Sequence, residues 1–155
     1  MPLVREQHGK PQLDGPGGLR FNVSDSGTIL VVAVTAGTDI GVDVELIRPV
    51  PRDMQLARRW FSKADAASLA RAPAELRERR FMELWTCREA IAKLSGDGLW
   101  GSSSLDPQSG TGGTSVLNVD VLPGYAAAVA VAGAPRAVRV LSLARSGLQR
   151  RQILT

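Results

Sequence analysis

Ile40-Gly41-Val42-Asp43-Val44-Glu45-Leu46 is the stretch of sequence that decides the fold of this chain. Its apolar residues fall on alternate positions, a pattern that predicts a β-strand. We expect its four aliphatic residues to face a core and Asp43 and Glu45 to project from the opposite side. At ~3.3 Å per residue the two Cα atoms lie roughly 7 Å apart, so both carboxylates can reach one hard cation. A solvated polar face on an edge strand is the alternative interpretation.

A long helix is predicted from Pro73 to Leu94, which is rich in Ala, Glu, Leu and Arg and has no interior Gly or Pro. Trp85, Glu89 and Lys93 are spaced i, i+4 and i+8, which places them within about 80° of one another on one helix face. An ordinary intrahelical Glu–Lys pair, worth ~0.3 kcal/mol, is the simpler explanation. A surface helix, however, would rarely align a Trp with its ion pair.

Length and composition indicate one domain over residues 1–155. The residues from Met1 to Gln12 lack the apolar run of a signal peptide, and no stretch reaches the ~18 apolar residues of a membrane span. The single cysteine, Cys87, excludes an internal disulfide and is consistent with the cytoplasm. It lies about 160° around the helix from Glu89, which argues against a nucleophilic role with that carboxylate.

The formal net charge of +4 comes with two arginine clusters, at 77–88 and 145–151. A solvated basic face explains them as well as a binding surface does. Nucleic-acid binding is not expected, because there is no aromatic interleaving and no nucleic-acid motif. An acidic protein partner and a polyanionic cofactor both fit the charge.

The order of predicted elements, two strands, helices and then three strands, indicates an α+β fold with an antiparallel sheet packed against the long helix. Asp53 and Ser62 are predicted to cap two shorter helices, and Gly96 and Gly98 to end the long one. The expected segments are a loop-like stretch at 1–20, strands at 21–23 (ended by a turn at 24–27), 28–35, 40–47, 116–121, 125–132 and 137–143, helices at 54–61 and 63–70, a flexible loop at 101–115, and a loose or helical tail at 146–155.

Two motifs together resemble the signature of the 4′-phosphopantetheinyl transferase superfamily. They are Gly41-Val42-Asp43-Val44-Glu45 and, some forty residues later, Trp85-Thr86-x-Arg88-Glu89-Ala90-x-x-Lys93. The family pattern is Gly-x-Asp-x-Glu on a strand, then Trp/Phe-Ser/Thr-x-Lys-Glu-x-x-x-Lys on a helix. Arg88 stands where Lys is usual and keeps the charge.

Four flanking segments look like the larger, Sfp-like members of that family: Gly9-Lys10-Pro11, Phe21 to Gly27, Gly96-Asp97-Gly98-Leu99, and Pro123 to Ala130. The length is instead that of the small members similar to holo-acyl-carrier-protein synthase. The resemblance therefore implies one half-unit of the larger fold plus part of the preceding segment. A homodimer or homotrimer is the simplest way to supply the other half, because active sites in this family lie between two halves.

The resemblance implies Mg²⁺-dependent (or Mn²⁺-dependent) transfer of 4′-phosphopantetheine from coenzyme A to a serine of an acidic apo acyl or peptidyl carrier protein, releasing adenosine 3′,5′-bisphosphate. By the same resemblance, Asp43 and Glu45 are metal ligands. Glu89 is a ligand or the general base, and Lys93 contacts a phosphate. Trp85 packs the helix onto the sheet.

The resemblance also assigns Lys10 to the 3′-phosphate of coenzyme A, and Ser24 with the turn after it to another phosphate. Asp25 stands where the family usually has His, and a carboxylate there would repel the phosphate unless it is protonated or turned away. Two other interpretations remain open: a catalytically weak relative that only binds coenzyme A or a carrier protein, and the same scaffold with different chemistry in a biosynthetic pathway.

Overall fold

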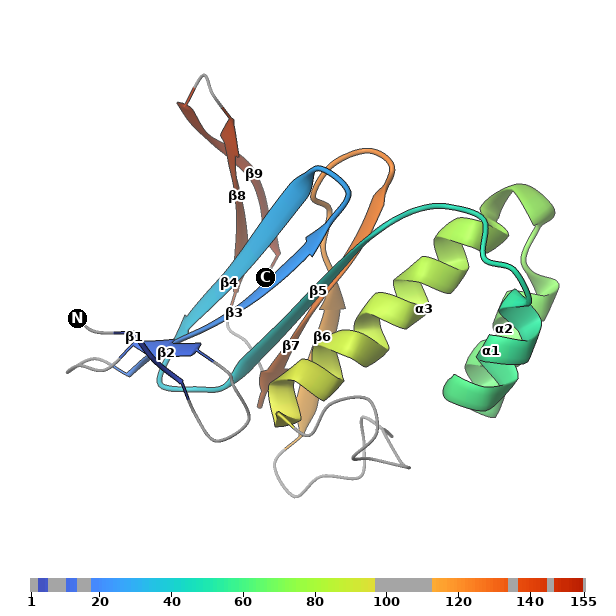
Figure 1. The fold of residues 1–155 in the computed structure, drawn as a ribbon, viewed down its shortest axis with the longest axis horizontal. Helices are drawn as coiled ribbons and strands as arrows, with labels where there is room; N and C mark the ends of the chain where they lie inside the picture. Colours follow the sequence, from blue (N-terminus) through green and yellow to red (C-terminus); the bar gives the residue numbers. More distant parts are fainter. Residues whose placement is uncertain are drawn as a thin grey trace.

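The computed structural model describes residues 3–5, 11–13, 18–96, 113–133, 137–144 and 147–154. Helix α3 lies across one face of a three-stranded antiparallel sheet with strand order β5-β7-β6, and the β3–β4 hairpin lies beside β5 (Figure 1). The elements are β1 (Leu3–Arg5), β2 (Pro11–Leu13), β3 (Leu19–Ser26), β4 (Ile29–Ala36), β5 (Ile40–Leu46), α1 (Asp53–Trp60), α2 (Lys63–Arg71), α3 (Ala74–Ser95), β6 (Thr114–Asn118), β7 (Tyr125–Ala132), β8 (Val138–Ala144) and β9 (Gly147–Leu154).

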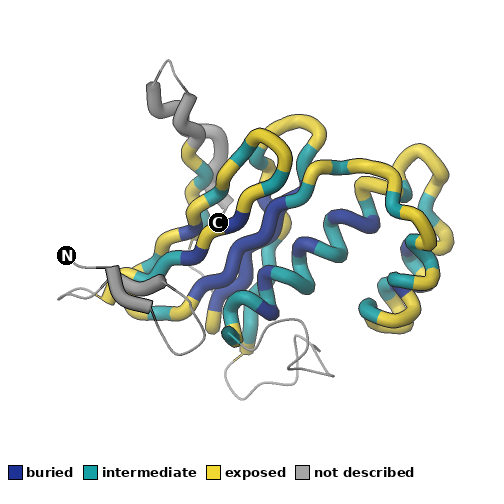
Figure 2. Tube along the Cα trace, viewed as in Figure 1, coloured by how far each residue is buried: buried dark blue, intermediate teal, exposed yellow. Residues whose placement is uncertain are grey.

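Strand β5 is buried on both faces and forms the centre of the molecule (Figure 2). On one face Val42 and Val44 are fully buried in a core that they share with Val129 and with Ala33 of β4. On the other face, Ala128 and Ala130 of β7 pack under α3. The expected α+β architecture, with a long helix against an antiparallel sheet, is confirmed.

Small residues on the helix-facing side allow α3 to lie unusually close to the sheet. A Cβ added to Gly41 would collide with the backbone oxygen of Ala90 and would lie 2.6 Å from the backbone nitrogen of Leu94. Gly41 is therefore required for the close approach of two backbones, and not for a special backbone dihedral.

Burial along β5 differs at two positions from the expectation that the aliphatic residues face a core and the carboxylates project from the other side. Asp43 is only 4% exposed because α3 covers it, whereas the aliphatic Leu46, expected to face a core, is 37% exposed. Strand alternation correctly gives the two faces of the strand. It does not tell which face a helix from elsewhere in the chain covers.

The helices agree with the sequence prediction more closely than the strands do. Ser62 caps α2 by accepting from the backbone N–H of Asp65 at 3.0 Å, and Gly96 ends α3 in the left-handed conformation. Asp53, predicted to be a cap, is instead the first residue of α1, and its carboxylate accepts from the N–H of Met54. Among the described helices, none has the length and apolar content needed to cross a bilayer.

Four segments differ from their predictions. The part of 1–20 expected to be loop-like contains the paired strands β1 and β2, and β3 begins at Leu19. Strand β3 continues through Ser26 where a turn was expected, so the turn falls at residues 27–28. The tail expected to be loose or helical contains β9, paired with β8. Residues 101–112 of the expected flexible loop lie outside the described residues. The end of that loop belongs to a strand instead, because β6 begins at Thr114.

Replacing Gly41 by Ala should lower the free energy of unfolding by about 3 kcal/mol or more, because the new methyl group meets backbone that cannot move aside without shifting α3. Gly37→Ala is the matched control: its φ of +74° strains any side chain, but its Cβ would meet no atom within 4 Å. The control should lose only about 1–2 kcal/mol. Denaturant unfolding measures both, and equal losses would contradict the close-approach argument.

Candidate active site

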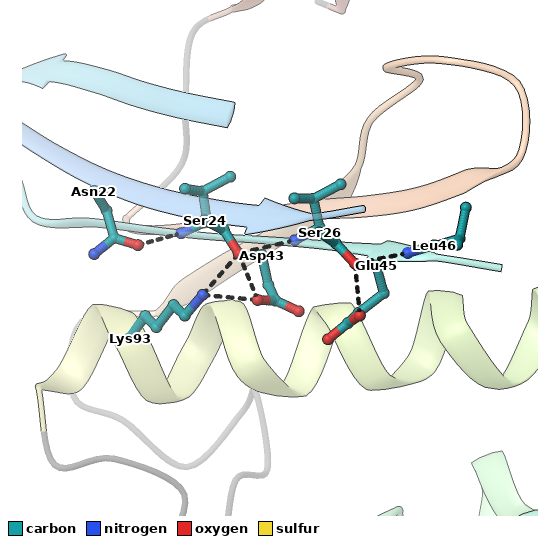
Figure 3. A network of polar contacts seen from close by, with 9 residues as sticks. Asn22, Ser24, Ser26, Asp43, Glu45, Leu46 and Lys93 are labelled. Carbon is teal, nitrogen blue, oxygen red and sulfur yellow. Dashed lines mark hydrogen bonds and ion pairs between the residues drawn. The ribbon is translucent and has the colours of Figure 1, made fainter. Parts of the chain in front are cut away.

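Side chains of β3 close the edge of β5 that does not face β7 (Figure 3). Here a polar side chain on every second residue of β3 accepts a hydrogen bond from every second backbone N–H of β5. We call these three residues of β3 the polar seam. The bonds run from Val42 N to Asn22 Oδ1 at 2.9 Å, from Val44 N to Ser24 Oγ at 3.3 Å, and from Leu46 N to Ser26 Oγ at 3.1 Å.

The two serines of the seam also bond to the two carboxylates of β5. Ser24 Oγ donates to Asp43 Oδ1 at 2.9 Å, and Ser26 Oγ donates to Glu45 Oε2 at 3.1 Å. Each hydroxyl therefore accepts one backbone amide and donates its proton to the carboxylate of the preceding residue on β5. The two carboxylates are in this way fastened to β3.

Lys93 brings a positive charge to Asp43 from α3. Its Nζ lies 2.7 Å from Asp43 Oδ1 and 2.9 Å from Ser24 Oγ. The second carboxylate oxygen, Asp43 Oδ2, is buried and has no hydrogen-bond partner among the described residues. A buried carboxylate oxygen without a partner carries a desolvation cost, so it is a ready acceptor for a further cation.

Glu45 and Glu89 lie close enough to Asp43 to feel its charge. Burial raises the pKa of Glu89 above its ordinary value, and the neighbouring Asp43 raises it further. Burial also raises the pKa of Glu45, with Asp43 adding to the rise, while the Ser26 hydroxyl opposes it. Three carboxylates that repel one another gain from a divalent cation placed between them.

The donor set fits a hard divalent cation in chemistry, since it consists of carboxylate oxygens from two facing elements, one of them without a partner. As they stand, no three acidic, histidine or cysteine side chains in the described part of the chain are arranged to hold a metal ion. Holding one would therefore require a side chain of this set to move, and Glu89, on α3, is the one that β3 does not fasten.

The other predicted phosphate contacts are not gathered at this site. Asp25 is exposed and lies on the opposite side of β3 from Ser24, because β3 continues as a strand through both. It therefore points away from Lys93 and the carboxylates. Lys10 lies outside the described residues.

Arg88 is held against helix α1 and does not form part of a free basic face. Its Nη1 donates to the backbone oxygen of Trp60 at 2.8 Å, and its guanidinium carbon lies 5.1 Å from the Trp60 ring centroid. Burial lowers the pKa of Arg88. Trp85 stacks on Phe81 and meets Phe61 edge-on, so it anchors the shorter helices to α3 more than it packs on the sheet.

Sequence reasoning missed Asn22 and Ser26 as site residues. Their signal was present in Phe21-Asn22-Val23-Ser24-Asp25-Ser26, where polar residues fill every second position next to a strongly apolar strand. Such an alternation predicts one polar face on a strand. Asn22 is 8% exposed and Ser24 6% exposed, so this polar face is turned inward.

Glu89→Gln should stabilise the protein without divalent ions at about pH 8, with the advantage shrinking as the pH falls toward about 4. A carboxyl whose pKa is raised on folding binds more protons in the folded state, so wild-type stability falls as the pH rises above the ordinary Glu value. Thermal midpoints across this pH range measure the difference. Glu75→Gln, on the first turn of α3, is the control, and a gap that stays constant with pH would contradict the expectation.

Comparisons with known proteins agree on one family. A model of the 4′-phosphopantetheinyl transferase superfamily matches residues 39–126, more than half of the chain. The 4′-phosphopantetheinyl transferase HetI of Nostoc sp. is 37% identical over 97 residues, covering 61% of this chain and 41% of the relative. The 4′-phosphopantetheinyl transferase psf-1 of Bacillus pumilus is 36% identical over 115 residues, covering 74% of this chain and 48% of the relative.

Among solved structures, holo-[acyl-carrier-protein] synthase of Thermotoga maritima superposes with a TM-score of 0.47 at 19% identity, covering 70% of each chain. The chain spans about half the length of the curated relatives it matches.

Proposed function

Since the chain belongs to the 4′-phosphopantetheinyl transferase superfamily, we propose that it transfers 4′-phosphopantetheine from coenzyme A to a serine of an acidic apo carrier protein in the cytoplasm. The observation that carries this proposal is the meeting of Asp43 on β5 with Lys93 on α3, 2.7 Å apart, at the two motifs that define the resemblance. Glu45 and Glu89 lie beside that pair and feel its charges.

We assign Asp43 and Glu45 to Mg²⁺ or Mn²⁺, and Glu89 either to the same ion or to the role of general base. When bound, the ion would neutralise the pyrophosphate oxygens of coenzyme A, whose negative charge otherwise repels a nucleophile. The unpartnered oxygen of Asp43 and the mutual repulsion of the carboxylates support this assignment. Lys93, already 2.9 Å from Ser24, would exchange its contact with Asp43 for a phosphate oxygen.

The transfer needs one bond formed and one broken. The serine oxygen of the carrier attacks the phosphorus that bears pantetheine, and the phosphoanhydride bond to adenosine 3′,5′-bisphosphate breaks. The serine proton goes to Glu89, or to water if Glu89 is a metal ligand. In the site without a cation, burial raises the pKa of Glu89, which makes it a stronger base than an exposed glutamate. Lys93 offsets the charge that develops on the transferred group.

Incubation with coenzyme A, Mg²⁺ and an apo carrier protein should add the mass of one phosphopantetheine to the carrier, and a chelator should abolish the gain. Asp43→Asn, which keeps the shape of the side chain but removes its charge, should lower the rate by about 10²-fold or more. Intact-mass spectrometry measures both. Asp120→Asn is the control, since Asp120 is exposed between β6 and β7 and lies outside both motifs.

A carrier that gains no mass across several families would contradict transfer. Coenzyme A binding that persists in that case would favour a member that only binds its ligand, and an altered nucleotide product would favour different chemistry on the same scaffold.

A second copy of the chain is also proposed to complete the site, and the observation that supports it is an exposed apolar surface. An apolar surface on the outward face of the β3–β4 hairpin is available for it. Three side chains of β4 on that face are exposed: Leu30 at 64%, Val32 at 50% and Val34 at 58%. A contiguous apolar face of this kind is typical of an interface.

Light scattering should therefore give two or three times 16.5 kDa. Val32→Glu should shift the mass to that of the monomer, because a charge in an apolar interface is left without a partner. Leu76→Glu is the matched control, since Leu76 is equally exposed, at 51%, but lies on α3. A stable monomer that carries out the transfer would contradict completion by a second copy.

A further inference from the structure

The polar seam does more than satisfy the edge of β5. All three of its side chains accept a backbone amide, but only Ser24 and Ser26 also bond to a side chain of β5. Asn22 has no such bond because the matching position on β5 is Gly41. Within the seam, Asn22 only accepts a hydrogen bond from a backbone amide of β5, whereas Ser24 and Ser26 also donate one to a carboxylate.

We propose that Ser26 is a positioning residue for Glu45, and Ser24 likewise for Asp43, in the cation site that the proposed function assigns to them. The Leu46 N–H donates to Ser26 Oγ at an N–O distance of 3.1 Å. The Ser26 hydroxyl in turn donates to Glu45 Oε2, with the two oxygens 3.1 Å apart. This bond selects one arrangement of a side chain with three rotatable bonds. The Glu45 side chain is then ordered before a cation arrives.

The same hydrogen-bond arrangement occurs twice, once at Ser24 and once at Ser26. Residues 24 and 26 of β3 stand against residues 43–44 and 45–46 of β5, so the same two-residue step repeats along both strands. A serine is short enough to hold its hydroxyl between the amide and the carboxylate at both steps. The inference assigns both serines to the carboxylates, and the phosphate contact that the resemblance implies for Ser24 stays a prediction.

Ser26 gives the cleaner test, because Ser24 also accepts from Lys93. Ser26→Thr and Ser26→Val have nearly the same shape and differ in the hydroxyl. The probe is Mn²⁺ alone, with free ion measured by electron paramagnetic resonance during titration of the otherwise unaltered chain. Asn22→Ala is the matched control, since it removes an amide acceptor of the same seam and leaves both serines in place.

Ser26→Val should weaken Mn²⁺ binding about ten-fold or more, in line with the loss of other residues that orient metal ligands, whereas Ser26→Thr should stay within about two-fold of wild type. Asn22→Ala should lower the thermal midpoint yet keep the Mn²⁺ affinity. Should the valine variant fail to fold by circular dichroism, Ser26→Ala, which adds no volume, takes its place with the same expectation.

Equal Mn²⁺ affinity in the valine and threonine variants overturns the inference, as does a loss in Asn22→Ala as large as that in Ser26→Val. A wild-type chain that binds Mn²⁺ but modifies no carrier overturns the proposed function and leaves this inference to be decided by the variants. A wild-type chain that binds no Mn²⁺ at millimolar concentration overturns both.

Discussion

The close approach of α3 to β5 is the constraint on which the rest of the structure depends. It is possible only because the helix-facing side of the sheet carries Gly41, Ala128 and Ala130 where other residues would hold the helix away. That short separation places Lys93 2.7 Å from Asp43. A few ångströms more would leave a buried carboxylate without its counter-ion, which proteins rarely tolerate. The small residues between α3 and the sheet are therefore what allows the ion pair between Asp43 and Lys93 to form.

Burial and charge are balanced unevenly across the site. Asp43 is the most enclosed of the three carboxylates and has both a hydroxyl donor and an ammonium group. Glu45 and Glu89 are half-buried, and their raised pKa values reflect lost hydration and the charge of Asp43. Without a cation, Asp43 is therefore held by two partners, whereas the ionised forms of Glu45 and Glu89 are destabilised by burial and by the charge of Asp43. Such an arrangement is stabilised by anything cationic that binds there.

The sequence predicted the residues of the two motifs well, because strand alternation and helical spacing are local properties. Asp43 and Glu45 share a strand face, and Glu89 and Lys93 share a helix face, whatever the rest of the chain does. The resemblance then brought the two faces together, and the meeting of Asp43 with Lys93 agrees with it. The assignment of these residues to a metal and a phosphate stays a prediction.

Non-local features were beyond such reasoning. The polar seam depends on the register between β3 and β5, which do not pair through their backbones, so no pattern within either segment specifies it. Asp25 was placed in a turn because Ser24-Asp25-Ser26-Gly27 has turn composition, yet the hairpin with β4 extends the strand through Ser26. The strands β1, β2 and β9 lack a clear apolar alternation and were missed for that reason.

The seam also bears on how such a protein can change over evolutionary time. A boundary made of backbone-to-backbone bonds is the same for almost every sequence, so substitution cannot adjust it one step at a time. Here the acceptors are the side chains of Asn22, Ser24 and Ser26, and each can be exchanged by a single codon change. The junction between the hairpin and the central sheet therefore depends on side chains, which the gene sequence specifies one by one. Descendants of this scaffold can tighten, loosen or re-aim each acidic side chain separately while the strands themselves stay where they are.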